Sequence, residues 1–72
     1  MAGVEGQIIA VFVVDEQGRA EAESVHFLQP DNELFEREVR VTLRGMRFIP
    51  AEVGGKKVRQ LVQMPFVFKL SQ

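Results

Sequence analysis

The sequence predicts an α+β fold: a three-stranded antiparallel sheet of chain order β-β-α-β and spatial order 2-1-3, with one helix packed on one face. Three features indicate this fold: an apolar run ending in a turn signal at residues 8–18, an amphipathic helical pattern at residues 33–46, and a long apolar segment at residues 58–70. The chain has 72 residues and no cysteine. We therefore expect one domain, residues 1–72, whose small core no disulfide stabilises.

The first two strands are expected to form a β-hairpin. Apolar residues fill positions 8–14, and the sequence "DEQG" follows at residues 15–18. An Asp at the first turn position and a Gly at the fourth suit a type I turn whose Gly has a positive φ. In the second strand the apolar alternation changes parity near Glu23 or Ser24, which predicts a β-bulge there.

One helix is expected over residues 33–46, "ELFEREVRVTLRGM". Asp31 or Asn32 can cap its start, because both side chains can accept hydrogen bonds from the first helical N–H groups. Four apolar side chains at helical spacing form the stripe that would face the sheet: Phe35, Val39, Leu43 and Met46.

Arginines form a basic stripe on another side of this helix. Its members are Arg37, Arg40, Arg44 and Arg47. Such a stripe can bind phosphate or anionic lipid, but glutamates interleave with it at i,i+4 spacing. The two expected pairs are Glu33–Arg37 and Glu36–Arg40. A solvated helix face is therefore favoured over a binding site.

The third strand is expected to run from Val58 to Leu70, after a loop marked by Pro50 and the pair Gly54–Gly55. One face of this strand would carry Val58, Val62, Met64, Phe66, Phe68 and Leu70. The other face would carry Arg59, Leu61, Gln63, Val67 and Lys69. The first strand is the most apolar on both faces, so it should be central and the third strand should be an edge.

Pro65 interrupts the most hydrophobic strand, "LVQMPFVFKL" at residues 61–70. Proline has no N–H to donate, so it is restricted to edge strands, strand starts and bulges. An edge strand whose proline nitrogen points outward resolves this conflict. The residues at 60–64 are then left open, and an open edge can bind an extended peptide by β-strand addition. An edge that is merely tolerated, or closed by a dimer contact, is the alternative.

Composition argues against several function classes. The net charge is −1, from 9 basic and 10 acidic side chains, whereas nucleic-acid-binding domains are usually strongly basic. No apolar run approaches the ~18 residues of a membrane span, and "MAGVEGQ" at the start does not resemble a signal peptide.

Catalytic and metal sites are not expected either. His26 is the only histidine, and without cysteine or clustered carboxylates it has no co-ligands for a metal. A Ser24–His26 pair is expected to be geometrically poor for catalysis. Glu21 and Glu23 would share a face, but no pocket is in prospect for them. We expect no enzyme activity, no cofactor and no small-molecule substrate.

Four stretches, in chain order, carry a family resemblance: "GQIIAVFVVDEQGRA", "LFEREV", "RFIP" and "PFVFKL". Over residues 6–70 they resemble the C-terminal domain of the TonB family, the energy transducers of the Gram-negative envelope. The tryptophan that this family carries before its Arg-Phe/Tyr-x-Pro segment is Met46 here. The resemblance implies a periplasmic domain of a parent protein anchored in the inner membrane by a segment absent from these residues.

The resemblance also implies a partner and a role. Members of the family bind the TonB box, a short extended segment of outer-membrane transporters, by adding it to the last strand. This contact couples inner-membrane energy to the uptake of siderophores, cobalamin and other nutrients. The alternative function is a self-associating domain, a homodimer that exchanges its last strand, in a TonB-like protein with another envelope partner.

The expected partner-binding residues lie on the last strand and in the "RFIP" segment before it. On the strand they are Val58, Arg59, Gln60, Leu61, Val62, Gln63 and Met64. In the segment they are Arg47, Phe48 and Pro50. A structural role is the alternative for the segment: Phe48 in the core, Arg47 beside the negative helix end, and Pro50 as a helix stop.

Overall fold

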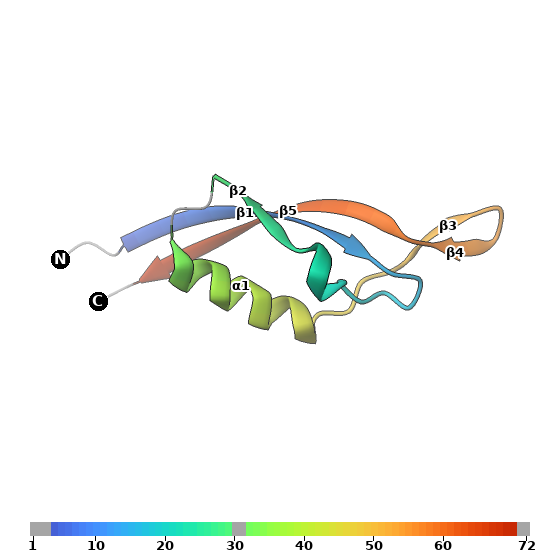
Figure 1. The fold of residues 1–72 in the computed structure, drawn as a ribbon, viewed down its shortest axis with the longest axis horizontal. Helices are drawn as coiled ribbons and strands as arrows, with labels where there is room; N and C mark the ends of the chain where they lie inside the picture. Colours follow the sequence, from blue (N-terminus) through green and yellow to red (C-terminus); the bar gives the residue numbers. More distant parts are fainter. Residues whose placement is uncertain (1–3, 30–31, 71–72) are drawn as a thin grey trace.

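The computed structural model describes residues 4–29 and 32–70, and a three-stranded antiparallel sheet forms its body (Figure 1). The elements in chain order are β1 (Val4–Val14), the 3₁₀ helix η1 (Ala22–Ser24), β2 (His26–Leu28), α1 (Glu33–Gly45), β3 (Ala51–Val53), β4 (Lys56–Val58) and β5 (Gln60–Leu70). The strand order β2-β1-β5 confirms the predicted order 2-1-3, with the helix on one face.

The sheet is dominated by one long strand pair. β1 and β5 are antiparallel over their whole length, with an unbroken register from Val4 opposite Leu70 to Val14 opposite Gln60. β2 adds three residue pairs on the other side of β1. The molecule is consequently elongated, measuring 53 × 20 × 16 Å, and Figure 1 shows the β3–β4 hairpin at the end remote from the start of β1 and the end of β5.

One face of β1 supplies the centre of the hydrophobic core. Phe12 and Ala10 are completely buried beneath α1, where Val39 and Leu43 point into the sheet. The other buried core residues are Ile8, Val14, Val25 and Phe27. Val62, Met64, Phe66 and Phe68 of β5 are half-buried against this cluster. The predicted alternation of β5 and the predicted helix stripe are therefore confirmed for these residues.

The turn after β1 has the predicted form. Asp15 Oδ1 accepts hydrogen bonds from the N–H groups of Gln17 and Arg19, both at 2.9 Å. The Gly18 N–H donates to the Asp15 carbonyl at 3.0 Å, and Gly18 has a φ of 86°. Its own carbonyl accepts a 2.8 Å bond from the Phe48 N–H, so the turn also holds the segment that follows α1.

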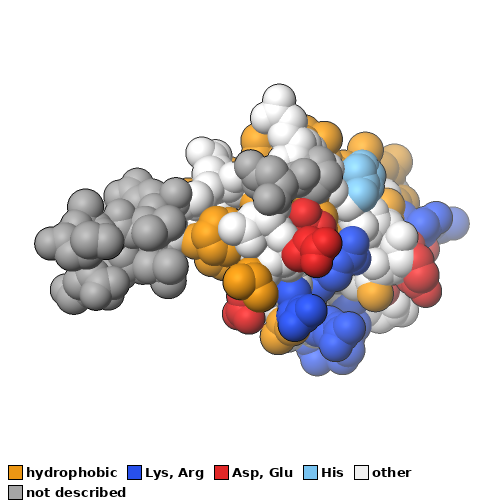
Figure 2. Space-filling view, turned by 60° about the vertical axis from the view of Figure 1, so that its left-hand side comes forward, with side chains coloured by type: hydrophobic (Ala, Val, Ile, Leu, Met, Phe, Trp, Pro, Cys, Tyr) orange, Lys and Arg blue, Asp and Glu red, His pale blue; other side chains and the backbone are white. Residues whose placement is uncertain are grey.

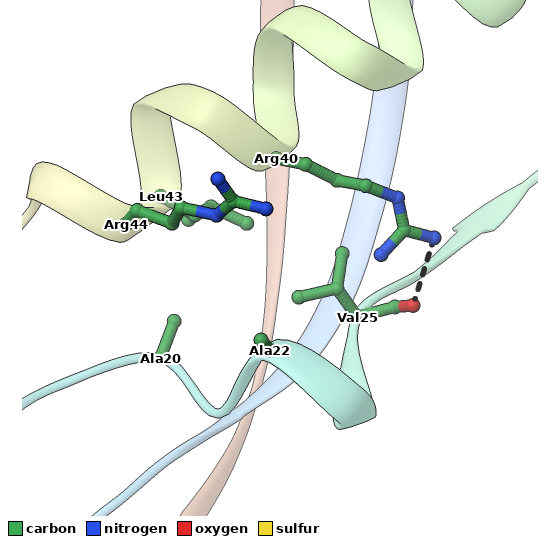
Figure 3. A pocket seen from close by; sticks show the side chains of 6 residues that line it. All are labelled: Ala20, Ala22, Val25, Arg40, Leu43 and Arg44. Atoms are coloured by element: carbon green, nitrogen blue, oxygen red, sulfur yellow. Dashed lines mark hydrogen bonds between the residues drawn. The ribbon is translucent and has the colours of Figure 1, made fainter.

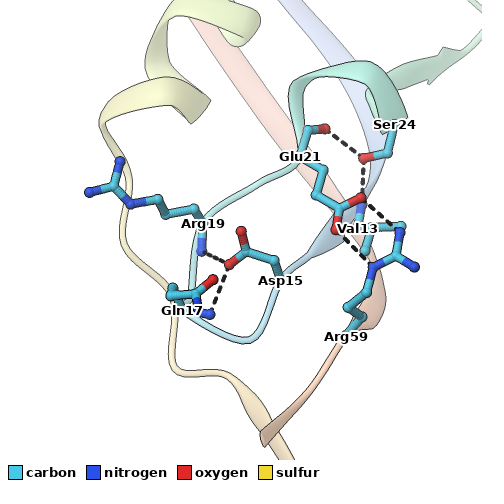
Figure 4. A network of polar contacts seen from close by, with 7 residues as sticks. All are labelled: Val13, Asp15, Gln17, Arg19, Glu21, Ser24 and Arg59. Carbon is cyan, nitrogen blue, oxygen red and sulfur yellow. Dashed lines mark hydrogen bonds and ion pairs between the residues drawn. The ribbon is translucent and has the colours of Figure 1, made fainter.

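The predicted second strand is confirmed only over residues 26–28, and the predicted bulge does not form. Ala20 forms only an isolated bridge with Val14, and residues 22–24 form a 3₁₀ helix rather than a bulged strand. The Ser24 hydroxyl takes the place of a strand neighbour: it accepts from the Val13 N–H at 2.8 Å and donates to the Glu21 carbonyl at 2.7 Å (Figure 4). This side chain therefore satisfies the edge of β1 that a continuous strand would have covered.

Ser24→Ala is expected to destabilise the protein by about 1–2 kcal/mol, because the Val13 N–H loses its partner in a half-buried position. Chemical denaturation monitored by circular dichroism would measure this change. Glu23→Ala is the matched control, since Glu23 is an exposed neighbour in the same turn. Equal stability of the two variants would contradict the role given to the hydroxyl.

The helix begins where the sequence predicts. Asn32 is its N-cap and accepts from the N–H groups of Leu34 and Phe35 at 3.0 and 3.1 Å. Asp31, the other predicted cap, lies outside the described residues. The helix ends at Gly45, and Met46 is its C-cap rather than its last residue.

The expected ion pairs on the helix do not form. The ion pair that the described residues contain joins Arg59 to Glu21 instead.

The loop predicted after α1 is wrong over residues 51–57, and Val58, predicted to begin the last strand, belongs to β4. These residues form the β3–β4 hairpin, in which Ala51 pairs with Val58 and Val53 pairs with Lys56. Gly54 and Gly55 form its two-residue turn with φ values of 59° and 81°, as a type I′ turn requires. β5 consequently starts at Gln60 and not at Val58.

Candidate functional site

The candidate site is the outer edge of β5. This strand pairs with β1 on one side, and no other described strand pairs with it. An unpaired edge presents N–H and C=O groups to any strand that approaches it. Only those residues of β5 that direct their backbone groups outward can pair with an added strand.

The hydrogen bonds of Val13 show which residues of β5 direct their backbone groups outward. Both its N–H and its carbonyl bond toward the η1 segment, to Ser24 Oγ and the Glu21 N–H, each at 2.8 Å. They therefore point away from β5, which makes Val13 and its partner Leu61 a pair without mutual hydrogen bonds. The backbone groups of Leu61 must then face the open edge.

The same alternation continues along β5 because its register with β1 has no bulge. Every second residue from Leu61 presents its backbone outward, which includes Gln63, Pro65 and Val67. Pro65, opposite Ile9, thus has its nitrogen at the open edge and costs no bond to β1. Proline in an apolar strand is explained by this geometry.

Residues on this outward series also carry side chains on the face of the sheet that α1 does not cover. Leu61 and Val67 are 68% and 64% exposed. On the same face lie Ile9 and Val13 of β1, both half-buried, and Leu28 of β2, which is 42% exposed. The open edge is therefore bordered by an apolar surface, which we call the uncovered face, comprising Ile9, Val13, Leu28, Leu61 and Val67.

The structure sorts the predicted binding residues on β5 into two groups. Leu61 and Gln63 direct their backbone groups outward, whereas Gln60, Val62 and Met64 direct theirs to β1. Val67 belongs to the outward group and was not among the predicted residues. Pro65 itself was the signal that could have found it, because its outward nitrogen sets the parity of every residue in the strand.

Val58 and Arg59, the first two predicted binding residues, do not lie on the open edge. Val58 is paired with Ala51 in the β3–β4 hairpin. Arg59 Nε and one terminal nitrogen donate to the two carboxylate oxygens of Glu21, both at 2.8 Å (Figure 4). The hydrogen bond and the charge of Glu21 raise the pKa of Arg59 above its usual value. This pair ties the start of β5 to the η1 segment.

The "RFIP" segment has a mainly structural arrangement. The rings of Phe48 and Phe12 lie 5.5 Å apart and tilted, and the Phe48 N–H is bonded to Gly18. Pro50 is half-buried just before β3, and Arg47 is exposed. Ile49, between them, is 94% exposed and is the most exposed large apolar residue of the described chain.

The polar residues considered for catalysis are not brought together. Glu21 is engaged by Arg59, and the His26 ring nitrogen lies 3.1 Å from the Ser24 carbonyl rather than from its hydroxyl. Among the described residues, no three metal-ligating side chains gather into a group. In the same part of the chain, no helix is long and apolar enough to cross a membrane.

Two comparisons with known proteins bear on the family of this chain. The family model "Gram-negative bacterial TonB protein C-terminal" matches residues 1–70. Among curated proteins, Protein TonB of Pseudomonas aeruginosa strain PAO1 is 33% identical over 70 residues, which are 97% of this chain. The chain spans about a fifth of the length of that relative. A match over nearly all of its residues shows that this chain belongs to the TonB C-terminal domain family.

Proposed function

We propose that this chain is a periplasmic peptide-binding module that engages the TonB box of outer-membrane TonB-dependent transporters by β-strand addition. The open edge of β5 is the observation that carries this proposal. Membership of the TonB C-terminal domain family supports the identity of the partner. In this role the chain would form part of an energy transducer for nutrient uptake, such as that of siderophores or cobalamin.

The geometry of β5 predicts where a peptide would pair. Leu61 and Gln63 each offer an outward N–H and C=O, whereas Pro65 offers only its carbonyl. Continuous pairing is therefore expected along residues 60–64 and to stop at Pro65. Beyond it, Phe68 stacks on Phe35 of α1 with ring centroids 4.4 Å apart, so the end of β5 anchors the fold.

Amide hydrogen exchange in the presence of a TonB-box peptide tests this proposal residue by residue. The Leu61 and Gln63 amides should become protected on binding, because they gain a bond they lack in the free protein. The Val62 and Met64 amides should change little, because they already bond to β1. Protection elsewhere in the molecule, with no change at Leu61 and Gln63, would rule out this edge as the binding site.

Pro65→Ala is expected to leave stability within about 1 kcal/mol, because no bond to β1 depends on residue 65. It restores one donor to the open edge, so peptide binding should be unchanged or tighter and self-association should increase. Isothermal titration and sedimentation would measure these two effects. Loss of binding by a folded Pro65→Ala variant would mean that the proline ring itself contacts the peptide.

The wider assignment follows from the family. We propose that the parent protein is anchored in the inner membrane and that this domain acts in the periplasm. An enzymatic role and a bound cofactor form no part of the proposal, since energy transduction by this family works through binding. Arg47 and Pro50 remain candidate peptide contacts beside the edge.

A second candidate function is self-association, which the uncovered face favours. Its side chains, together with the open edge of β5, could be covered by a second copy that exchanges its last strand. Sedimentation velocity across a concentration series separates the two cases. A monomer at high micromolar concentration would exclude a functional homodimer, while a dimer that dissociates on peptide addition would show that both partners use the same edge.

A further inference from the structure

A small groove lies between α1 and the segment that leads into β2, on the side of the sheet away from β5 (Figure 3). Its apolar lining consists of Ala20, Ala22, Val25 and Leu43, and its polar lining consists of Arg40 and Arg44. Figure 3 shows both arginines leaving the helix above the two alanine side chains. These short side chains leave the groove open where larger residues would fill it.

Arg40 is held in place by two contacts. One of its terminal nitrogens donates to the Val25 carbonyl at 3.3 Å, and its guanidinium carbon lies 5.1 Å from the centre of the Phe27 ring. A guanidinium has five N–H donors, so most of them are still available. A side chain already fixed in position loses less entropy when it binds a further group.

The charge around the groove is not balanced locally. No aspartate or glutamate lines it, and neither Arg40 nor Arg44 forms an ion pair within the part of the chain that the structure describes. Figure 2 shows Lys and Arg side chains gathered low on one face of the molecule, with Asp or Glu side chains beside some of them. The helix as a whole has three glutamates and three arginines and hence no net charge. The groove therefore differs from the helix as a whole in its local positive charge.

We propose that this groove binds the carboxylate of an acidic side chain on a partner protein. Arg40 and Arg44 would donate to the carboxylate oxygens, and the carbon atoms of the side chain would contact the four apolar residues. The groove encloses about 50 Å³. This suits a single carboxylate, because small-molecule pockets usually measure roughly 300–1,000 Å³.

The absence of net charge on the helix argues against an anionic membrane as the ligand. Attraction to a lipid surface adds up over many exposed cations, and here glutamates cancel them. Arg40 and Arg44 extend in the same direction from neighbouring turns of α1 and both line the groove, which favours a single, directed carboxylate. Because the groove and the β5 edge lie on opposite sides of the sheet, a ligand in the groove would leave that edge open.

The test uses the 72-residue chain and two matched peptides, acetyl-Ala-Glu-Ala-amide and acetyl-Ala-Gln-Ala-amide, at millimolar concentration. NMR should show the glutamate peptide shifting the backbone signals of Ala20 and Ala22 and the side-chain Nε signals of Arg40 and Arg44. The glutamine peptide should not shift them, since it lacks the charge. Equal responses to the two peptides, or no response to either, would overturn the proposal.

Variants separate this groove from general electrostatic attraction. Arg44→Gln should weaken binding of the glutamate peptide by at least about tenfold, because it removes a charged hydrogen bond. Ala22→Leu should have a similar effect by filling the groove while retaining both arginines. Arg37→Gln is the control: it removes the same charge from the same helix outside the groove and should leave binding unchanged.

Two further outcomes would overturn the proposal. An Arg37→Gln effect as large as that of Arg44→Gln would show a diffuse charge effect. Vesicles containing anionic phospholipid are the second probe, compared with neutral vesicles. If they shift these signals while the glutamate peptide does not, the groove recognises a membrane surface and not a protein.

Discussion

Replacing Gln63 with proline is expected to weaken TonB-box peptide binding by at least about tenfold, while the protein stays folded. The reason is the parity of β5: the Gln63 N–H faces the open edge, so proline there removes a bond to the peptide and none to β1. Pro65 shows that this strand accepts a proline in the same orientation. Isothermal titration with the peptide, and circular dichroism for the fold, would measure both results.

Two matched variants make this prediction specific. Gln63→Ala keeps the backbone N–H and removes only the side chain, so it should retain most of the binding. Val62→Pro places the proline one residue earlier, where the N–H bonds to β1, and should cost about 1–3 kcal/mol of stability because a β1 carbonyl loses its partner. If Gln63→Pro and Val62→Pro destabilise the protein equally, the assigned direction of the β5 backbone is wrong.

Gly18→Ala is expected to destabilise the protein by about 3 kcal/mol, a large share of the stability of a chain this short. Gly18 has a φ of 86°, a conformation that alanine adopts only with strain. A Cβ at this position would also overlap the carbonyl oxygen of Phe48. Because that atom belongs to the backbone, relief of the overlap requires movement of the turn away from the segment after α1.

The matched control is Gly45→Ala at the end of α1. Gly45 has no positive φ, and a Cβ there would meet nothing within 4 Å. Alanine favours helix more than glycine does, so this variant should be neutral or slightly stabilising. Thermal unfolding of both variants would compare them. Similar melting temperatures would mean that the turn can move without cost and that its contact with Phe48 is not structural.

The sequence by itself determined the elements whose signals are local. The apolar run at residues 8–14 predicted β1, the "DEQG" turn predicted a positive φ at Gly18, and spacing by three and four predicted the buried stripe of α1. The apolar run and the helical spacing each record side chains that one element buries, and the turn depends on the conformational freedom of one glycine, so a short stretch of sequence reveals each of them. Pro65 belongs with them, because a missing N–H excludes a central strand wherever the chain folds.

Only the tertiary structure decided features that depend on contacts between distant residues. Ser24 replaces a strand neighbour because its hydroxyl reaches Val13, and the Arg59 side chain pairs with Glu21 just before β5 begins. In both cases a side chain met a specific partner that lies many positions away in the sequence. Sequence periodicity records how buried each position is, and it carries no information about such pairings.

The β3–β4 hairpin and the candidate site show the same division. The pair Gly54–Gly55 indicated a loop in the sequence. Only the pairing of Ala51 with Val58 showed that the flanking residues form strands that end before β5. The edge strand was predicted correctly. Two hydrogen bonds of Val13 were needed to show which residues of that strand direct their backbone groups outward. Backbone direction is set by neighbouring strands, and therefore it becomes known only when the sheet is assembled.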